Sequence, residues 1–328
     1  MKRMLSGIKP TGQLHLGNYI GALRNFVKYQ DDYEMYAFIA NLHCITIYQD
    51  PQTLKKNLRD CAALYLACGL DPNKAVIFQQ SDVRAVAQLG WIMECNSYLG
   101  ELNRQTQYKD KVAKGETGLT VGLYAYPTLM ASDILIYSSD YVPVGEDQKQ
   151  HVELARDIAL RFNHRYGETF VVPEPLIAEV GARIMDLQDP TRKMSKSDNS
   201  DKGCIYLLDD PKRARKKVMS AVTDNVGIVQ FDRENQPGVA NLLQILSSLT
   251  NEPIDSIVRR MEGKGYGDFK KEVADAVEAE LTRIQTEYHR ILDEGILENV
   301  LREGAEKANR TAEKMLHKVQ KKIGVEIF

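Results

Sequence analysis

The segment Lys193–Ser197 has the sequence KMSKS, so two ammonium groups and two hydroxyls fall within five residues. A lysine acts as a point charge that can follow the oxygens of a polyphosphate while they move during a reaction. This composition therefore suits a loop that grips a polyphosphate. Alone it is weak evidence, because a short Lys/Ser segment is usually only a solvated loop.

A second polar segment, residues 6–19, has the sequence SGIKPTGQLHLGNY and follows a short apolar run. Glycine and proline interrupt it, and an apolar stripe at helical spacing begins at Leu16, which predicts a strand, a loop and a helix. His15 and Asn18 then stand at the helix start, beside free N–H groups that favour a phosphate, and Gly17 allows close approach of a nucleotide. The alternative is an ordinary turn with an incidental histidine.

Two common phosphate-binding motifs are missing from the sequence. It contains neither the G-x-x-x-x-G-K-[ST] pattern of a P-loop nor a G-x-G-x-x-G pattern after a predicted strand. If the chain binds a nucleotide, the two separate segments must hold the phosphates between them.

The composition is that of an ordinary globular protein of 328 residues, with 43% hydrophobic and 27% charged residues. We find no apolar run near the roughly 18 residues of a membrane helix, and no secretory signal at the amino terminus. The net charge of −2 argues against tight non-specific binding of nucleic acid. Basic clusters at 212–217 and 314–322 could each contact a phosphate backbone or simply form a solvated helix face.

The five cysteines stand at positions 44, 61, 68, 95 and 204 and form no C-x-x-C pair. Scattered thiols in odd number are typical of a reducing compartment, and they indicate neither a disulfide scaffold nor a zinc site. We therefore expect a cytoplasmic protein without a bound metal of its own.

Short β-branched or aromatic runs alternate with helical patterns in the first half of the chain. The predicted strands are Arg3–Ile8, Met35–Ala40, Ala75–Phe78 and Tyr141–Val144, and the predicted helices are Leu16–Tyr29, Thr53–Cys68, Ala85–Leu99, Leu129–Tyr137 and Gln148–Phe162. The alternation predicts an α/β fold, a Rossmann-like parallel sheet with helices on both faces. Both polar segments would fall at the carboxyl ends of strands, where such sheets bind ligands.

Beyond about residue 200 the strand patterns fade and helical spacing dominates, ending in a helical segment at Glu306–Val319. We therefore predict a Rossmann-like domain over residues 1–202, an all-helical C-terminal domain over 203–292, and a C-terminal helix within 293–328.

Four blocks, in this order and spacing, resemble a known family. The residues HLGN at 15–18 resemble the first signature of the class I aminoacyl-tRNA synthetases, and Lys193–Ser197 resembles the second. The blocks Tyr126–Leu135 (YPTLMASDIL) and Val144–His151 (VGEDQKQH) are more specific, and the whole set is similar to the bacterial-type tryptophanyl-tRNA synthetases. Asn18 replaces the histidine of many class I enzymes, although the tryptophan branch commonly has asparagine there.

The resemblance implies an enzyme that activates L-tryptophan with ATP, releases pyrophosphate and transfers the tryptophanyl group to the 3′ end of tRNA(Trp). It also implies a homodimer, a helical domain that reads the anticodon, a last helix that packs back on the sheet domain, and Mg²⁺ bound through the ATP phosphates. In such a reaction, positioning and charge stabilisation supply most of the rate.

By resemblance, the catalytic residues are His15, Asn18, Lys193 and Lys196, which would donate to phosphate oxygens and neutralise the departing pyrophosphate. The ATP-binding set is Lys9, Pro10, Thr11, Gly17, Asn18, Gly145, Glu146, Asp147, Gln148, Ile184, Lys193, Met194, Ser195, Lys196 and Ser197. Lys9 stands where bacterial relatives often have glutamine, and it could either tighten nucleotide binding or point into water.

Asp133 lies in the otherwise almost wholly apolar stretch Leu129–Ile136. A buried carboxylate needs a donor, and an indole N–H, which can only donate, matches it. A site of this kind can discriminate by factors on the order of 10⁴. The alternative is an aspartate bonded to a backbone N–H or a lysine. By resemblance, the tryptophan-binding set is Asp133, Met130, Tyr126, Gln107, His43, Val142, Val144, Leu5 and Gly7.

Two other functions remain open at this point. A tyrosine-specific relative would share the fold, and a phenol can also bond to an aspartate, although Met130 and the Val144–His151 block favour tryptophan. A non-catalytic paralogue that binds nucleotide or RNA would be expected to lose His15, Lys193 or Lys196, and all three are present.

Overall fold

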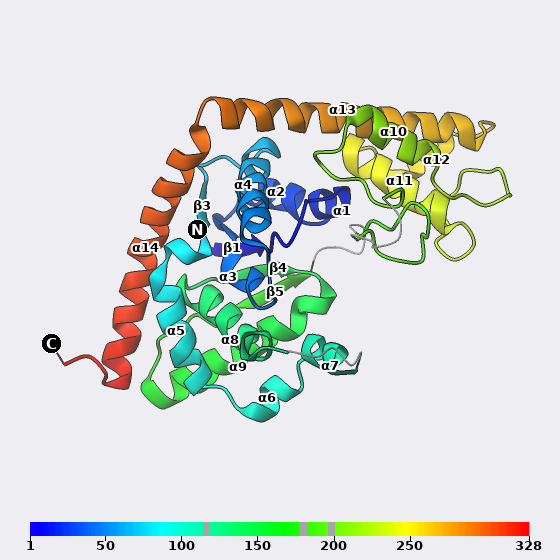
Figure 1. The fold of residues 1–328 in the computed structure, drawn as a ribbon. Helices are drawn as coiled ribbons and strands as arrows, with labels where there is room; N and C mark the ends of the chain where they lie inside the picture. The colour runs from blue at the N-terminus through cyan, green and yellow to red at the C-terminus, as the bar shows by residue number, and fades with distance from the viewer. Residues whose placement is uncertain (114–118, 178–182, 196–200, 328) are drawn as a thin grey trace.

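A parallel sheet forms the centre of the computed structural model, which describes residues 1–113, 119–177, 183–195 and 201–327 (Figure 1). Its strands are β1 (Arg3–Ile8), β2 (Glu34–Ile39), β3 (Ala75–Gln79), β4 (Tyr141–Val144) and β5 (Glu174–Ile177). They lie in the order β3-β2-β1-β4-β5, and each neighbouring pair is parallel. The predicted α/β fold class is confirmed.

The first four strands lie within one residue of their predicted bounds, but the sequence analysis missed β5. This strand has only four residues and contains Pro175, whose missing N–H cannot join a hydrogen-bond ladder. Such a strand is tolerated because β5 lies at the edge of the sheet.

Helices connect the strands and follow them. They are α1 (Leu16–Asn18), α2 (Arg24–Tyr29), α3 (Asn41–Cys44), α4 (Pro51–Ala67), α5 (Arg84–Cys95), α6 (Leu99–Asn103), α7 (Thr106–Ala113), α8 (Val121–Ile136) and α9 (Lys149–Tyr166). The described chain also contains a π-helix, η1 (Tyr19–Leu23), and two 3₁₀ helices, η2 (Gln80–Asp82) and η3 (Glu146–Gln148). Of the helices in the described ranges, none is both long enough and apolar enough to cross a membrane.

Local capping explains where two of these helices begin. The N–H of Thr53 donates to the Asp50 carboxylate at 2.8 Å, which fixes the start of α4. The N–H of Leu123 donates to Thr120 Oγ1 at 3.1 Å, so α8 starts at Val121 and not at the predicted Leu129. The predicted helix Ala85–Leu99 was also wrong at its end, because the chain leaves α5 at Cys95 and begins α6 at Leu99.

The side chains of the strands alternate between two hydrophobic cores. Met4, Met35 and Ile77 point to one face, where α2 and α4 cover the sheet. Leu5 and Phe38 point to the other face, which α5, α8 and α9 cover. Residues on both faces are fully buried, as expected for a parallel sheet that is sandwiched between helices.

The chain beyond residue 203 is helical in its described part, with α10 (Pro211–Met219), α11 (Pro237–Thr250), α12 (Ile254–Arg260) and α13 (Tyr266–Asp293). In Figure 1, α10, α11 and α12 gather along one half of α13, and the other half of α13 passes over α4. Tyr288 on α13 donates its hydroxyl to Asp60 on α4 at 2.8 Å. The hydroxyl of Tyr19, at the start of η1, likewise donates to Glu280 on α13.

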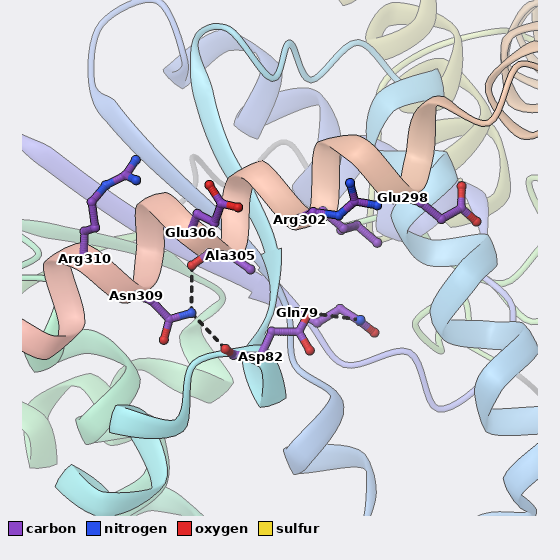
Figure 2. A pocket seen from close by; sticks show the side chains of 9 residues that line it. Gln79, Asp82, Glu298, Arg302, Ala305, Glu306, Asn309 and Arg310 are labelled. Atoms are coloured by element: carbon purple, nitrogen blue, oxygen red, sulfur yellow. Dashed lines mark hydrogen bonds between the residues drawn. The ribbon is translucent and has the colours of Figure 1, made fainter.

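The last helix, α14 (Ile296–Ile323), turns back along the sheet and packs on β3, α5 and α8 (Figure 1). Figure 2 shows its crossing with β3, where a hollow of about 700 Å³ lies between the two elements. The side-chain amide of Asn309 donates there to the Asp82 carbonyl at 2.9 Å. Gly304 allows the crossing, because a Cβ atom at this position would lie 1.8 Å from the Ile77 carbonyl oxygen.

We predict that Gly304→Val lowers the free energy of unfolding by roughly 1–3 kcal/mol, since α14 must move away from β3 to accommodate the side chain. Denaturant unfolding of the full chain measures the change. Gly267→Ala in α13 is the matched control, because its Cβ would meet no atom within 4 Å and should slightly stabilise the helix. Unchanged stability of Gly304→Val would contradict the close packing described above.

Candidate active site

A cavity of about 1070 Å³ opens at the carboxyl ends of β1, β2 and β4. Residues of both predicted sets line its wall. Those of the tryptophan set are Leu5, Gly7, His43, Tyr126, Met130, Asp133, Val142 and Val144, and those of the ATP set are Lys9, Gly17, Asn18, Gly145, Glu146, Gln148, Ile184 and Lys193. The fold thus brings together residues that lie as far apart in the chain as Leu5 and Lys193.

Several predicted site residues do not form part of this wall. The described ones are Pro10, Thr11, His15, Met194 and Ser195. Lys196 and Ser197, and the side chains of Gln107 and Asp147, fall outside the described part of the structure.

Asp133, on α8, provides a buried carboxylate in the cavity wall, with an exposed fraction of 2%. The side-chain amide of Gln80 donates to both carboxylate oxygens, at 2.9 and 2.8 Å, and His43 Nε2 lies 2.9 Å from Oδ2. Burial raises the pKa of Asp133, whereas the contacts with His43 and Gln80 oppose the rise. The partners are therefore two side chains, whereas the alternative expected from the sequence was a backbone N–H or a lysine.

Gln80 is a residue of the site that the sequence analysis missed. It is fully buried in η2, immediately after β3, and its side-chain oxygen accepts the Leu42 N–H at 3.0 Å. It therefore links the start of α3, which carries His43, to the carboxylate on α8. The only signal in the sequence was its place after a predicted strand, at the same sheet edge as the other site residues.

Apolar side chains surround the carboxylate end of the cavity. Leu5, Met130, Ile134 and Val142 line it, and a Cβ atom on Gly7 would lie 2.6 Å from the Phe38 ring, so any larger residue there would displace that ring. This part of the wall suits a flat apolar group that carries one polar hydrogen.

Two aromatic side chains extend this end of the wall. The ring of Tyr126 packs edge-on against His43, with the ring centres 6.1 Å apart. Its hydroxyl lies 2.8 Å from His151 Nε2, and His151 Nδ1 lies 2.8 Å from Gln105 Oε1. The contact with buried His151 therefore fixes the orientation of the Tyr126 side chain.

The other end of the cavity is formed by the loop after β1 and by the start of the first helix. The His15 N–H donates to Asn18 Oδ1 at 3.1 Å, which closes the helix start. Asn18 and Gly17 line the cavity, and the His15 ring lies beside Gly17. Lys9 also lines the wall, and its ammonium donates to Thr46 Oγ1 at 3.4 Å.

The second signature segment reaches the same end of the cavity through a small antiparallel turn. Lys193 pairs with Met185, and the Met194 N–H donates to the Ile184 carbonyl at 2.9 Å. A Cβ atom on Gly17 would lie 3.7 Å from the Met194 Cβ. The two signature segments therefore lie side by side at Gly17 and Met194, although they are far apart in the chain.

Across the described ranges, we find no group of three or more His, Cys, Asp or Glu side chains placed to hold a metal ion. The cationic and hydroxyl-bearing residues at the helix end of the cavity instead suit an anionic ligand. The site thus combines a phosphate-binding end with an apolar pocket that contains one buried acceptor.

Comparison with known proteins agrees with this arrangement. The family model described as tRNA synthetases class I (W and Y), which covers the tryptophan and tyrosine enzymes, matches residues 1–282. The chain therefore belongs to the class I tRNA synthetases of this family.

Full-length relatives narrow the likeness to the tryptophan enzymes. The tryptophan–tRNA ligase of Bacillus subtilis (strain 168) is 54% identical over 322 residues, which cover 98% of this chain and 97% of the relative. The tryptophan–tRNA ligase of Bacillus anthracis is 52% identical over 325 residues, with coverage of 99% and 98%. The resemblance to bacterial-type tryptophanyl-tRNA synthetases is confirmed.

Solved structures agree with these relatives. The tryptophanyl-tRNA synthetase of Mycoplasma pneumoniae superposes with a TM-score of 0.90 at 39% identity, covering 99% of this chain and 98% of that one. The Campylobacter jejuni enzyme, complexed with ADP and tryptophan, gives a TM-score of 0.83 at 39% identity, with coverage of 98% and 99%.

Proposed function

We propose that the chain is an ATP-dependent tryptophan–tRNA ligase. It would activate L-tryptophan to tryptophanyl-adenylate with release of pyrophosphate, and then transfer the tryptophanyl group to the 3′ end of tRNA(Trp). One observation carries this proposal: the buried Asp133 carboxylate lies in the wall of the same cavity that Lys193 and the first helix reach. The tryptophan–tRNA ligases that match over the whole chain support it.

Selection of tryptophan rests on the acceptor capacity of Asp133. An ionised carboxylate offers about four lone-pair positions. His43 and Gln80 make three contacts with it, which leaves capacity for one further donor. An indole N–H is donor only, so it suits this position, and a substrate without that hydrogen would leave the acceptor unpaired in an apolar surrounding.

Activation of tryptophan would take place at the junction of the two halves of the cavity. The substrate carboxylate attacks the α-phosphorus of ATP, and the bond to pyrophosphate breaks. His15 and Asn18 would donate to phosphate oxygens, while Lys193 and Lys196 neutralise charge on the leaving pyrophosphate. Because the chain needs to supply little covalent chemistry, its contribution is to hold both substrates in line.

The remaining ATP-site residues would hold the nucleotide against the wall. Gly145 and Gly17 allow close approach of the ribose and base, and Asp147 would accept from ribose hydroxyls. Mg²⁺ would bind through the phosphates, since that ion usually bridges substrate oxygens. Lys9 would add a cation beside the triphosphate.

The rest of the assignment follows the family. We propose a catalytic domain over residues 1–202, an anticodon-binding helical domain over 203–292, and a final helix over 293–328 that packs on the catalytic domain. The expected partners are L-tryptophan, ATP, tRNA(Trp) and a second copy of the chain in a homodimer. We expect the enzyme to act in the cytoplasm.

The decisive experiment is exchange of labelled pyrophosphate into ATP, measured with tryptophan and with tyrosine. Exchange that depends on tryptophan supports the proposal. Exchange that depends on tyrosine would favour the tyrosine-specific alternative, and no exchange with either amino acid would support a non-catalytic nucleotide-binding protein.

Substitutions at the two ends of the cavity should affect different kinetic constants. We predict that Asp133→Ala raises the KM for tryptophan by roughly 100-fold and leaves the KM for ATP nearly unchanged. Lys193→Ala should lower the kcat of activation by roughly 100-fold with little effect on the KM for tryptophan. Lys212→Ala, at an exposed position of α10, is the surface control. Equal loss of tryptophan affinity in both variants would contradict this division.

Gln80→Met should change the pH dependence of tryptophan binding. Burial raises the pKa of Asp133 and Gln80 helps to oppose it, so removal of this donor should raise the pKa further. A protonated Asp133 binds the indole N–H less well, so the KM for tryptophan should rise as the pH falls, and that rise should begin at a higher pH in the variant. Superimposable profiles of the KM for tryptophan would rule out this role, with the KM for ATP as the internal control.

A further inference from the structure

The segment Asp201–Asp209 joins the two signature segments through its backbone. Toward one side, the Leu187 N–H donates to the Gly203 carbonyl at 2.9 Å, two residues after Met185, which pairs with Lys193. Toward the other side, the Leu16 N–H donates to the Ile205 carbonyl at 2.8 Å, and Tyr206 pairs with His15. The position of this segment therefore sets the distance between the His15 region and the Lys193 region.

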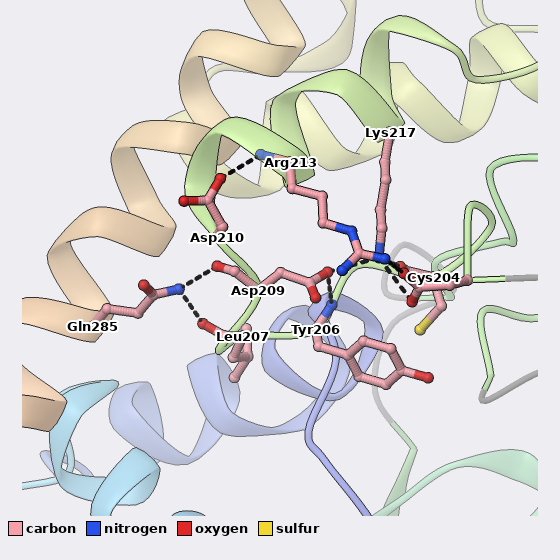
Figure 3. A network of polar contacts seen from close by, with 9 residues as sticks. Cys204, Tyr206, Leu207, Asp209, Asp210, Arg213, Lys217 and Gln285 are labelled. Atoms are coloured by element: carbon pink, nitrogen blue, oxygen red, sulfur yellow. Dashed lines mark hydrogen bonds and ion pairs between the residues drawn. The ribbon is translucent and has the colours of Figure 1, made fainter.

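One buried lysine holds the segment in place. Lys217 extends from α10 into the polar network of Figure 3, and its side chain is only 6% exposed. Its ammonium donates to Asp201 Oδ1 at 3.0 Å, to the Cys204 carbonyl at 2.7 Å and to Asp209 Oδ2 at 2.8 Å. An ammonium has three hydrogens, so these three acceptors use its full capacity and fix its direction.

The three contacts are spread over the whole segment. Asp201 and Asp209 stand at its two ends, and Cys204 lies between them. Asp209 Oδ2 also accepts the Tyr206 N–H at 3.0 Å, so the lysine is connected to the residue that pairs with His15. Loss of the ammonium would leave a carboxylate and a carbonyl buried without this donor, and the segment would have to rearrange to hydrate them.

A second support comes from α13. The side-chain amide of Gln285 donates to the carbonyls of Leu207 and Asp209, at 2.9 and 2.7 Å (Figure 3). This support secures only the far end of the segment. The contacts near Asp201, closest to the Lys193 region, come from Lys217 and from the more exposed Arg213.

We infer that Lys217 is a positioning residue for the activation step, which holds the His15 and Lys193 regions at the separation that the triphosphate requires. The side chain is not part of the cavity wall, so it would act through the segment and not on the substrate. This inference rests on the proposed function, because it assumes that both regions bind ATP. Asp133 and its partners lie at the other end of the cavity and should be unaffected.

We expect Lys217→Met to lower the kcat of tryptophan-dependent pyrophosphate exchange by roughly 10- to 100-fold, since small misplacements of positioning groups cost rates of this order. The KM for tryptophan should stay within about twofold of the unaltered enzyme, because the apolar pocket is untouched. Active-site titration corrects the rates for any loss of folded protein.

Arg215→Met is the matched control for a purely structural effect. Arg215 lies two residues away on α10 and forms ion pairs with Asp275 and Glu278 on α13, and not with the described segment Asp201–Asp209. It should lower the thermal midpoint without changing the kcat per folded enzyme. An equal loss of kcat in both variants would overturn the inference.

A double-variant cycle tests whether Lys217 acts through the Lys193 region. If it does, Lys217→Met should cost clearly less in a Lys193→Ala background than in the unaltered chain. Fully additive losses, or an unchanged kcat in Lys217→Met, would refute the inference. If Lys217→Met does not fold, Asp201→Asn, at a half-exposed position, should show the same loss of kcat at constant KM for tryptophan, and failure to do so refutes it equally.

These outcomes are separate from failure of the proposed function. The unaltered chain shows tryptophan-dependent exchange if the proposed function is correct, whatever the variants do. Absence of that exchange would refute the proposed function itself, whereas normal exchange with an unaffected Lys217→Met would refute only the role of Lys217.

Discussion

Burial of the Asp133 carboxylate is the constraint on which the arrangement of the cavity depends. A charge removed from water must be met by fixed donors, and here they come from two elements other than α8: His43 on α3 and Gln80 in η2. Because α3 follows β2 and η2 follows β3, the carboxylate fixes the ends of two strands relative to each other. The same contacts that make the burial tolerable therefore also shape the pocket.

The opposite end of the cavity is built by a different principle. Its shape comes from backbone hydrogen bonds and isolated bridges that join the segments around His15, Met185 and Tyr206, and the buried ammonium of Lys217 holds the last of these segments in place. Backbone pairing with Met185 places Lys193 in the cavity wall, where its ammonium suits an anionic ligand. The rigid Asp133 carboxylate suits the amino-acid side chain, which does not react. The flexible ammonium of Lys193 suits the phosphates of ATP, where a bond breaks in the proposed reaction.

Much of this could be predicted from sequence, because periodicity and glycine placement report local structure. The strands β1 to β4 and the helix start at His15 were found in this way. Gln80 and Lys217 could not be predicted, because their roles depend on contacts with residues distant in the sequence. Gln80 bonds to a residue more than fifty positions away, and Lys217 to one sixteen positions away. A single glutamine or lysine gives no sequence pattern that reveals such a contact. In particular, the sequence of the basic run around Lys217 favours a solvated helix face, and only burial distinguishes this lysine from its neighbours.

The close crossing of α14 over β3 determines when the edge of the sheet becomes covered in the nascent chain. β3 is an outermost strand of the sheet, and the helix that packs against it follows more than 200 residues later in the chain. Until the ribosome has synthesised α14, the edge of β3 is uncovered and can pair with other extended chains. Coverage of that edge therefore has to wait for α14, and a chain truncated before Gly304 would leave the edge of β3 exposed to aggregation.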